Sequence, residues 1–198
     1  MSDIASAVPT SIRRLDNRDA ARLARLVSAY DDLQTVLRCC ERLMTMVGDG
    51  SDDVAVEALW TLALLSYARS FADGEGGAVL TESDLGAGSE AADRLRWHRV
   101  LLRLRAQHAD PGVNPRETYT VGVAQDPSGA VSAVAVTSVR TPSVDAAAVR
   151  QAGALAFPLC AVLDERIDPL QQRILADARR FGRAQLDRMP VIEVAREQ

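Results

Sequence analysis

Lysine is absent from this chain of 198 residues, and all 23 of its basic side chains are arginine. This absence excludes a phosphate-loop NTPase that needs its lysine, a Schiff-base lysine and a lysine general base. The glycine-rich run at 73–77 is therefore interpreted as a loop. A phosphate cradle is excluded there as well, because the acidic residues of this run would repel phosphate.

Aromatic side chains make up only 4% of the chain, so its core has to be built from alanine, leucine and valine. Such a composition favours closely packed helices. Cysteine occurs only as Cys39, Cys40 and Cys160, without the Cys-x-x-Cys or Cys/His spacing of a zinc site. We expect buried, reduced thiols in a reducing compartment, with no bound metal and no cofactor.

An excess of positive charge is also lacking, since the net charge is −4. The whole molecule therefore has no attraction to nucleic acid or to anionic lipid, and such a contact would need a local patch. No basic start with a long apolar run is present, and we find no stretch of about eighteen apolar residues that could span a bilayer. We expect a cytoplasmic protein with no membrane contact.

The length fits one medium domain, and the periodicity predicts a mainly α fold. We expect a four- or five-helix bundle with an inserted two-stranded β-hairpin. Residues 1–15 are expected to form a loose N-terminal arm, and 16–198 a single helical-bundle domain. Helices are predicted at 18–47, 53–71, 90–109, 145–165 and 168–189, and a mobile glycine-rich loop at 73–89.

The predicted helix at 18–47 carries an apolar heptad stripe over about four repeats. Its members are Leu23, Leu26, Tyr30, Leu33, Leu37, Cys40, Met44 and Val47. Two interpretations fit this pattern: burial against the rest of the same chain, or a seam for self-association with a second copy. The next helix, 53–71, is apolar nearly all round and is expected to be the most buried element.

The β-hairpin is predicted at about 117–140. Two β-branched runs, 119–124 and 131–136, alternate in polarity and flank the turn sequence Asp126-Pro-Ser-Gly129. Because an isolated hairpin is marginally stable, we expect it to pack on the helices as a small flap.

Polar chemistry is concentrated on the predicted third helix, between Arg96 and His108, which holds both histidines of the chain. At 100° per residue, His98 and Arg105 lie in a narrow polar strip between two apolar stripes. Two interpretations of this strip stay open. It is either a buried structural network of Glu57, His98 and Arg105 joining two helices, or a pocket in which histidines transfer protons.

In the second interpretation His98 and His108 would act as general acid and base, and Arg105 would hold a phosphate group. A neutral histidine could then activate a ribose 2′-hydroxyl without any metal. The remaining arginines of this helix, Arg96, Arg99 and Arg103, are predicted to point outward. They form either a plain solvated face or a nucleic-acid-binding patch.

The second and third helices, at about 53–117, resemble the HEPN superfamily of bacterial helical proteins. The resemblance rests on Trp60, on Tyr67-Ala-Arg69-Ser-Phe71 and on His98-x2-Leu101-x2-Leu104-Arg105-x2-His108. It implies a helical bundle, often dimeric. Many members are metal-independent RNases of toxin–antitoxin and antiphage systems, whereas others are binding or scaffold modules.

The nuclease signature of that superfamily is an arginine followed four to six residues later by a histidine. Arg103 and His108 have this spacing, but a histidine six residues after Arg105 is missing, because Pro111 occupies that position. We therefore expect a non-catalytic interaction or scaffold protein, dimeric and with a possible protein partner. The alternative is a metal-independent RNase or RNA-binding protein that uses the arginine-histidine helix.

Overall fold

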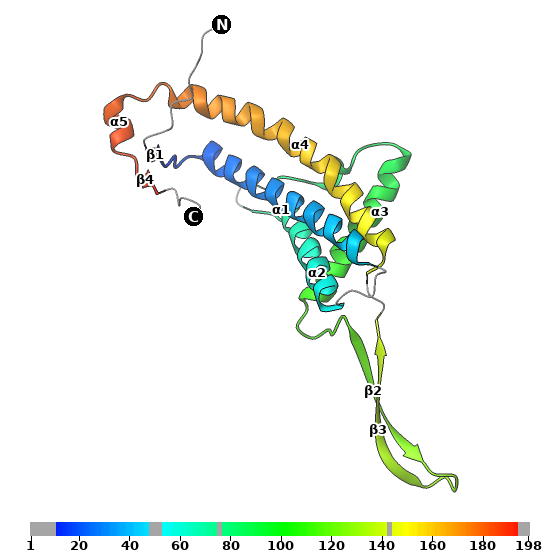
Figure 1. The fold of residues 1–198 in the computed structure, drawn as a ribbon. Coiled ribbons are helices and arrows are strands. Elements are labelled where there is room, and N and C mark those ends of the chain that lie inside the picture. Colours follow the sequence, from blue (N-terminus) through cyan, green and yellow to red (C-terminus); the bar gives the residue numbers. More distant parts are fainter. Residues whose placement is uncertain (1–10, 48–52, 75–76, 142–143, 194–198) are drawn as a thin grey trace.

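The computed structural model describes residues 11–47, 53–74, 77–141 and 144–193. This part of the chain forms five α-helices, a long two-stranded hairpin and a second pair of very short strands (Figure 1). The predicted fold class, a mainly α bundle with an inserted β-hairpin, is confirmed.

The two long helices, α1 (Arg18–Met46) and α4 (Ala146–Ala178), pack side by side and supply much of the core (Figure 1). Each begins at a capping residue: the side chain of Asn17 accepts a hydrogen bond from the N–H of Ala20, and Asp145 caps α4 in the same way. Three heptad positions of α1 are buried within this chain: Leu26, Leu33 and Cys40. The three cysteines are buried and unpaired, as expected, and burial raises the pKa of Cys40 to about 11.

Helix α2 (Asp53–Ser70) packs between α1 and α3 (Ser89–Ala109), with Trp60 and Tyr67 buried. It is less enclosed than predicted, because Val54 is 71% exposed and Leu62 is 43% exposed. The reason is that no described element covers the side of α2 that faces away from its two neighbouring helices.

An ion pair that the sequence did not reveal joins α1 to α2. The Nε of Arg69 donates to the carboxylate of Asp32 at 3.1 Å, and the same guanidinium donates to Ser66. Asp32 is only 9% exposed, so its charge needs such a partner.

The segment after α2 is more ordered than predicted. The 3-10 helix η1 (Glu82–Leu85) follows Leu80, which is fully buried. Arg166 of α4 holds this segment: its guanidinium contacts the carboxylate of Asp84 at 3.2 Å and donates to the carbonyl of Val79. The prediction of a mobile loop over the whole of 73–89 was therefore wrong, because this segment contains η1. Residues 75–76 lie outside the described residues.

The predicted break near residue 168 was also wrong. Helix α4 continues through Pro158 and Pro169 to Ala178, and only the short α5 (Arg183–Asp187) lies in the rest of the predicted fifth helix. The buried side of α4 runs on past the second proline, through Leu159, Leu163, Ile167 and Leu170. Continuous packing on this side outweighs the loss of one backbone hydrogen bond at each proline.

The first and last strands of the described residues lie side by side (Figure 1). Residues 1–10 of the predicted loose arm lie outside the described residues. The next part is not loose, because strand β1 (Ile12–Arg13) pairs with β4 (Val191–Ile192) in antiparallel fashion.

The predicted hairpin is present as β2 (Glu117–Gln125) and β3 (Val131–Arg140). The carboxylate of Asp126 accepts the N–H groups of Ser128 and Ala130, and Gly129 has a φ of +86°, which favours glycine. The expectation of a flap packed on the helices was wrong. The hairpin projects from one end of the bundle as a long arm, and its length carries β2 and β3 away from any helix that could cover them (Figure 1).

Two ion pairs at the base connect this arm to the start of α2. Arg140 lies 3.5 Å from Asp53, and Arg116 lies 3.6 Å from Glu57. Beyond this base, β2 and β3 pack closely against each other and against no other described helix or strand. We call residues 117–140 the arm.

Candidate functional site

Helix α3 places His98 inside the protein. The residue is 2% exposed, and its Nδ1 shares a hydrogen bond of 2.9 Å with the hydroxyl of Tyr67. The ring of Phe71 packs against it at 4.5 Å between centroids. Burial lowers the pKa of His98, with the nearby Glu82 acting in the opposite direction and Arg99 adding to the decrease. Burial also raises the pKa of Tyr67, so both groups of this pair are neutral near pH 7.

The predicted network of Glu57, His98 and Arg105 does not form. Glu57 pairs with Arg116 at the base of the arm, and Arg105 is exposed without a hydrogen bond or ion pair among the described residues. Arg105 follows His98 by two helical turns on the same face. The last two turns of α3, however, have no buried residue, so the core covers His98 but not Arg105.

The residues predicted for catalysis are not brought together within one chain. His98 is buried, Arg105 lies in solvent, and the Nδ1 of His108 is 2.9 Å from the carbonyl of Leu104 in its own helix. Within the described ranges no hydrogen bond or ion pair connects any two of these three side chains. The sequence predicted that His98 and Arg105 share one face of α3, but it could not show that only His98 is covered by the core.

The outward arginines are exposed, and two of them have acidic partners. Arg96 lies 3.2 Å from Asp93, and Arg99 lies 3.3 Å from Glu82. Arg103 is exposed with no partner in the part of the chain that the structure describes. The carboxylates of Asp93 and Glu82 thus balance part of the positive charge on the outward face of α3.

The buried His98 predicts a pH dependence of stability. Its pKa in the folded protein lies below the ordinary value of 6.5, so the unfolded chain takes up the proton first. We expect the contribution to be complete above pH 6.5 and to decrease as the pH falls from there toward the lowered pKa. Melting temperatures at pH 7.5 and pH 5.5 should therefore differ more for the wild type than for His98→Asn. An equal difference in both proteins would contradict this assignment.

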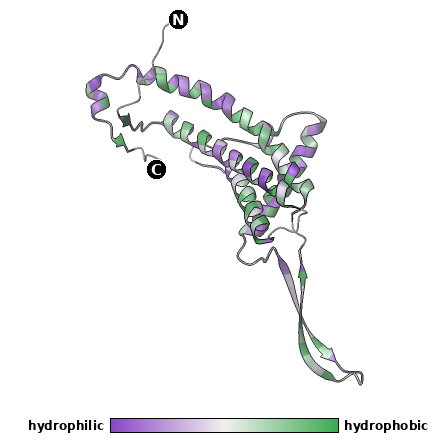
Figure 2. Cartoon of the chain, in the orientation of Figure 1, coloured by the Kyte–Doolittle hydropathy of each residue, from purple (hydrophilic) through white to green (hydrophobic). Residues whose placement is uncertain are grey.

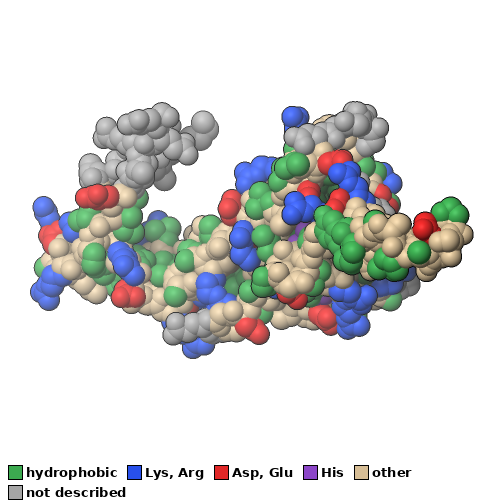
Figure 3. All heavy atoms as spheres, turned by 90° about the horizontal axis from the view of Figure 1, so that it is seen from below, with side chains coloured by type: hydrophobic (Ala, Val, Ile, Leu, Met, Phe, Trp, Pro, Cys, Tyr) green, Lys and Arg blue, Asp and Glu red, His purple; other side chains and the backbone are tan. Residues whose placement is uncertain are grey.

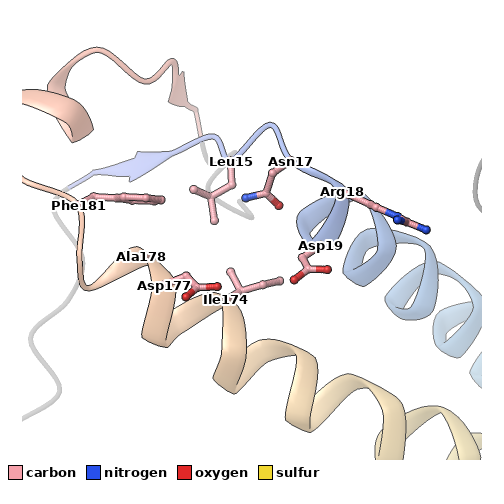
Figure 4. Close-up of a pocket in the computed structure, with 8 residues that line it drawn as sticks. All are labelled: Leu15, Asn17, Arg18, Asp19, Ile174, Asp177, Ala178 and Phe181. Carbon is pink, nitrogen blue, oxygen red and sulfur yellow. The ribbon is translucent and has the colours of Figure 1, made fainter.

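The clefts of the described residues include two that lie against α1. Figure 4 shows the first, of about 200 Å³, between the start of α1 and the end of α4. Its carboxylates already have partners, since Asp19 pairs with Arg173 and Asp177 with Arg180. The second cleft, of about 360 Å³, contains Arg166, which is held by Asp84. Arg22 and Arg25 also line the second cleft, and Arg25 donates to the carbonyl of Gly77.

The arm carries an exposed apolar face. Residues that pair across an antiparallel ribbon share one side, so the register places five large side chains on the same side. They are Tyr119, Val121, Val123, Val134 and Val136, and each is at least 59% exposed. We call this set the valine face. The opposite side carries mostly small residues: Thr118, Thr120, Gly122, Ala124, Ala133, Ala135, Thr137 and Val139.

The edges of the arm also lack protection. Residues 118–125 and 130–139 include no charged side chain and no proline, which are the usual means of keeping an exposed strand from pairing. Figure 2 shows the apolar character along both strands, and Figure 3 shows hydrophobic side chains gathered over the arm. The alternation of polarity in the sequence predicted the two strands. The same alternation indicates that their large apolar side chains lie on one side of the arm.

Comparison with protein-family models, with curated protein sequences and with solved structures gave no significant match. Among the residues that the structure describes, one helix, α4, is long and apolar enough to cross a membrane by length and composition alone. The expectation that no stretch of the chain could span a bilayer does not hold for α4 by this criterion. Because one side of α4 is buried against α1, α4 also has the properties of a long apolar core helix.

Proposed function

We propose that this protein is a non-catalytic interaction protein that joins an assembly through its arm. The observation that carries the proposal is the valine face: five large side chains are at least 59% exposed on a ribbon that is attached to the bundle only at its base. Burying each of them would contribute roughly 1–2 kcal/mol. An isolated hairpin is marginal in water, so contact with another chain would also stabilise the arm itself.

The arginine-histidine helix, α3, also supports a non-catalytic role. His98 is enclosed by Tyr67 and Phe71, where a substrate could not reach it without opening the core. The resemblance to the HEPN superfamily agrees with this assignment, because some of its members act as binding or scaffold modules.

The test compares native assemblies. The tagged protein, purified from its own cells, should elute as a complex larger than one chain. A variant with Val121→Ser, Val134→Ser and Val136→Ser should elute as a single chain. The matched control carries Thr118→Ser, Thr120→Ser and Thr137→Ser on the opposite side of the arm and should keep the complex. A wild type that elutes as a single chain would refute the proposed function.

A second candidate function is a metal-independent RNase or an RNA-binding protein. The observation in its favour is that Arg103 and Arg105 lie in solvent on the last turns of α3, near His108 in the chain. Cleavage of labelled RNA in the presence of EDTA tests it. Activity that is lost in folded Arg105→Ala and His108→Ala variants would establish this function in place of the first.

A further inference from the structure

A second exposed apolar surface lies on α4. Its outer side, turned away from the buried face that packs on α1, carries Ala147, Ala154, Phe157, Pro158 and Ala161, all of them exposed. Phe157 is the most prominent, with 72% of its surface open to solvent. The exposed Arg150 and Gln151 lie on the same side among these residues, and Arg150 is the one charged residue between positions 147 and 161. We call this set the outer stripe of α4.

The arm is long enough to lie along the whole outer stripe. Nine residues of strand extend for about 30 Å at roughly 3.3 Å per residue, and the fifteen residues of the stripe extend for about 21 Å of helix. Both begin at the same end of the bundle, because β3 ends at Arg140 and α4 begins at Ala146. Within one chain, however, the arm points away from α4 (Figure 1). It cannot cover the stripe of its own chain, but it can reach that of a second copy.

The areas favour a reciprocal contact. One side of a two-stranded ribbon covers about 30 Å by 10 Å, or roughly 300 Å², whereas a stable interface buries about 800 Å² on each partner. A single contact between an arm and a stripe is therefore too small. Two-fold symmetry makes the contact twice, so that each copy contributes its arm and its stripe, roughly 600 Å² of footprint. Protruding side chains bring the accessible area closer to the standard value.

We propose that two copies of this chain exchange arms, with the valine face of each arm packed on the outer stripe of α4 of the other copy. Phe157 then inserts among the valines, and two apolar surfaces that are exposed in the single chain cover each other. This inference rests on the proposed function of the arm as the interaction surface, and it names the occupant as a second copy.

The experiment measures the mass of the purified full-length protein by light scattering and sedimentation over a range of micromolar concentrations. The wild type should have twice the mass of one chain. Val136→Arg and Phe157→Glu should each weaken dimerisation at least tenfold. An equimolar mixture of the two variants should restore the dimer, since that pair keeps one unchanged contact and places arginine against glutamate in the other.

Matched controls are available next to both positions. Thr137→Arg changes the neighbouring residue on the opposite side of the arm, and Gln171→Glu changes an exposed residue of α4 outside the stripe. Both variants should remain dimers, and all four should keep the helix content of the wild type in circular dichroism, because the substituted side chains are exposed.

Two results would overturn the exchange. A dimer that persists in Phe157→Glu but is lost in Val136→Arg would mean that the arms contact each other. A wild type that stays a single chain at every concentration would exclude a second copy as the occupant. In that case a larger native complex would still support the proposed function, so the two failures are distinguishable.

Discussion

Replacing Arg166 with methionine should lower the free energy of unfolding by about 3 kcal/mol. Its guanidinium holds both the carboxylate of Asp84 and the carbonyl of Val79, and the two side chains are only 34% and 12% exposed. Methionine keeps the apolar stem but leaves a charge and a carbonyl without their partner. We take the lower end of the range for broken buried ion pairs, because water reaches a third of the arginine. Urea unfolding of both proteins measures the difference.

The matched control is Arg173→Met, on the same helix. Its ion pair with Asp19 is much more exposed, at 57% and 36%, so we expect a loss of less than about 1 kcal/mol. Equal losses in the two variants would contradict the special role of Arg166.

The pH gives a further check on the Arg166 pair. Burial tends to raise the pKa of Asp84, but hydrogen bonds from Arg166 and Thr81 outweigh it, and the pKa is lowered from 3.8. The stabilisation is thus present above that value and is lost as the pH falls through the lowered pKa. The difference between wild type and Arg166→Met should shrink accordingly in acid.

Local signals made the first three helices and the hairpin predictable. Asn17 caps α1, and the turn from Asp126 to Gly129 closes the hairpin through hydrogen bonds within five residues. The end of α4 was not predictable in this way. Pro169 is a strong local stop signal, and only the packing of Ile167 and Leu170 into the core carries the helix past it.

The candidate site shows the same limit. Periodicity placed His98 and Arg105 on one face of α3, but it could not show that the neighbouring helices cover the first residue and not the second. The partner of His98 is Tyr67, 31 residues away, and no spacing rule connects the two. The valine face, in contrast, follows from strand alternation once the register of the hairpin is known. The exposure of the valine face cannot be predicted in this way, because it depends on whether another element covers the arm. No described element does.

The largest stability effect that we expect comes from Leu33→Ala, which should cost about 3–4 kcal/mol. Leu33 is fully buried on α1, so truncating its side chain removes packing and leaves a cavity. Met44 belongs to the same heptad stripe but is 40% exposed, and Met44→Ala should cost less than about 1 kcal/mol.

This pair of variants also separates the two interpretations of the stripe. If α1 packs only within its own chain, both losses are independent of protein concentration. If the stripe is a seam between two copies, Met44→Ala would cost as much as a core substitution, and the melting temperature would rise with concentration. Thermal and urea unfolding at two concentrations, about fiftyfold apart, decides between them when both variants are made in the Val136→Arg background, where the exchange of arms no longer contributes. Dimerisation through α1 would then still add a term that grows with the logarithm of concentration.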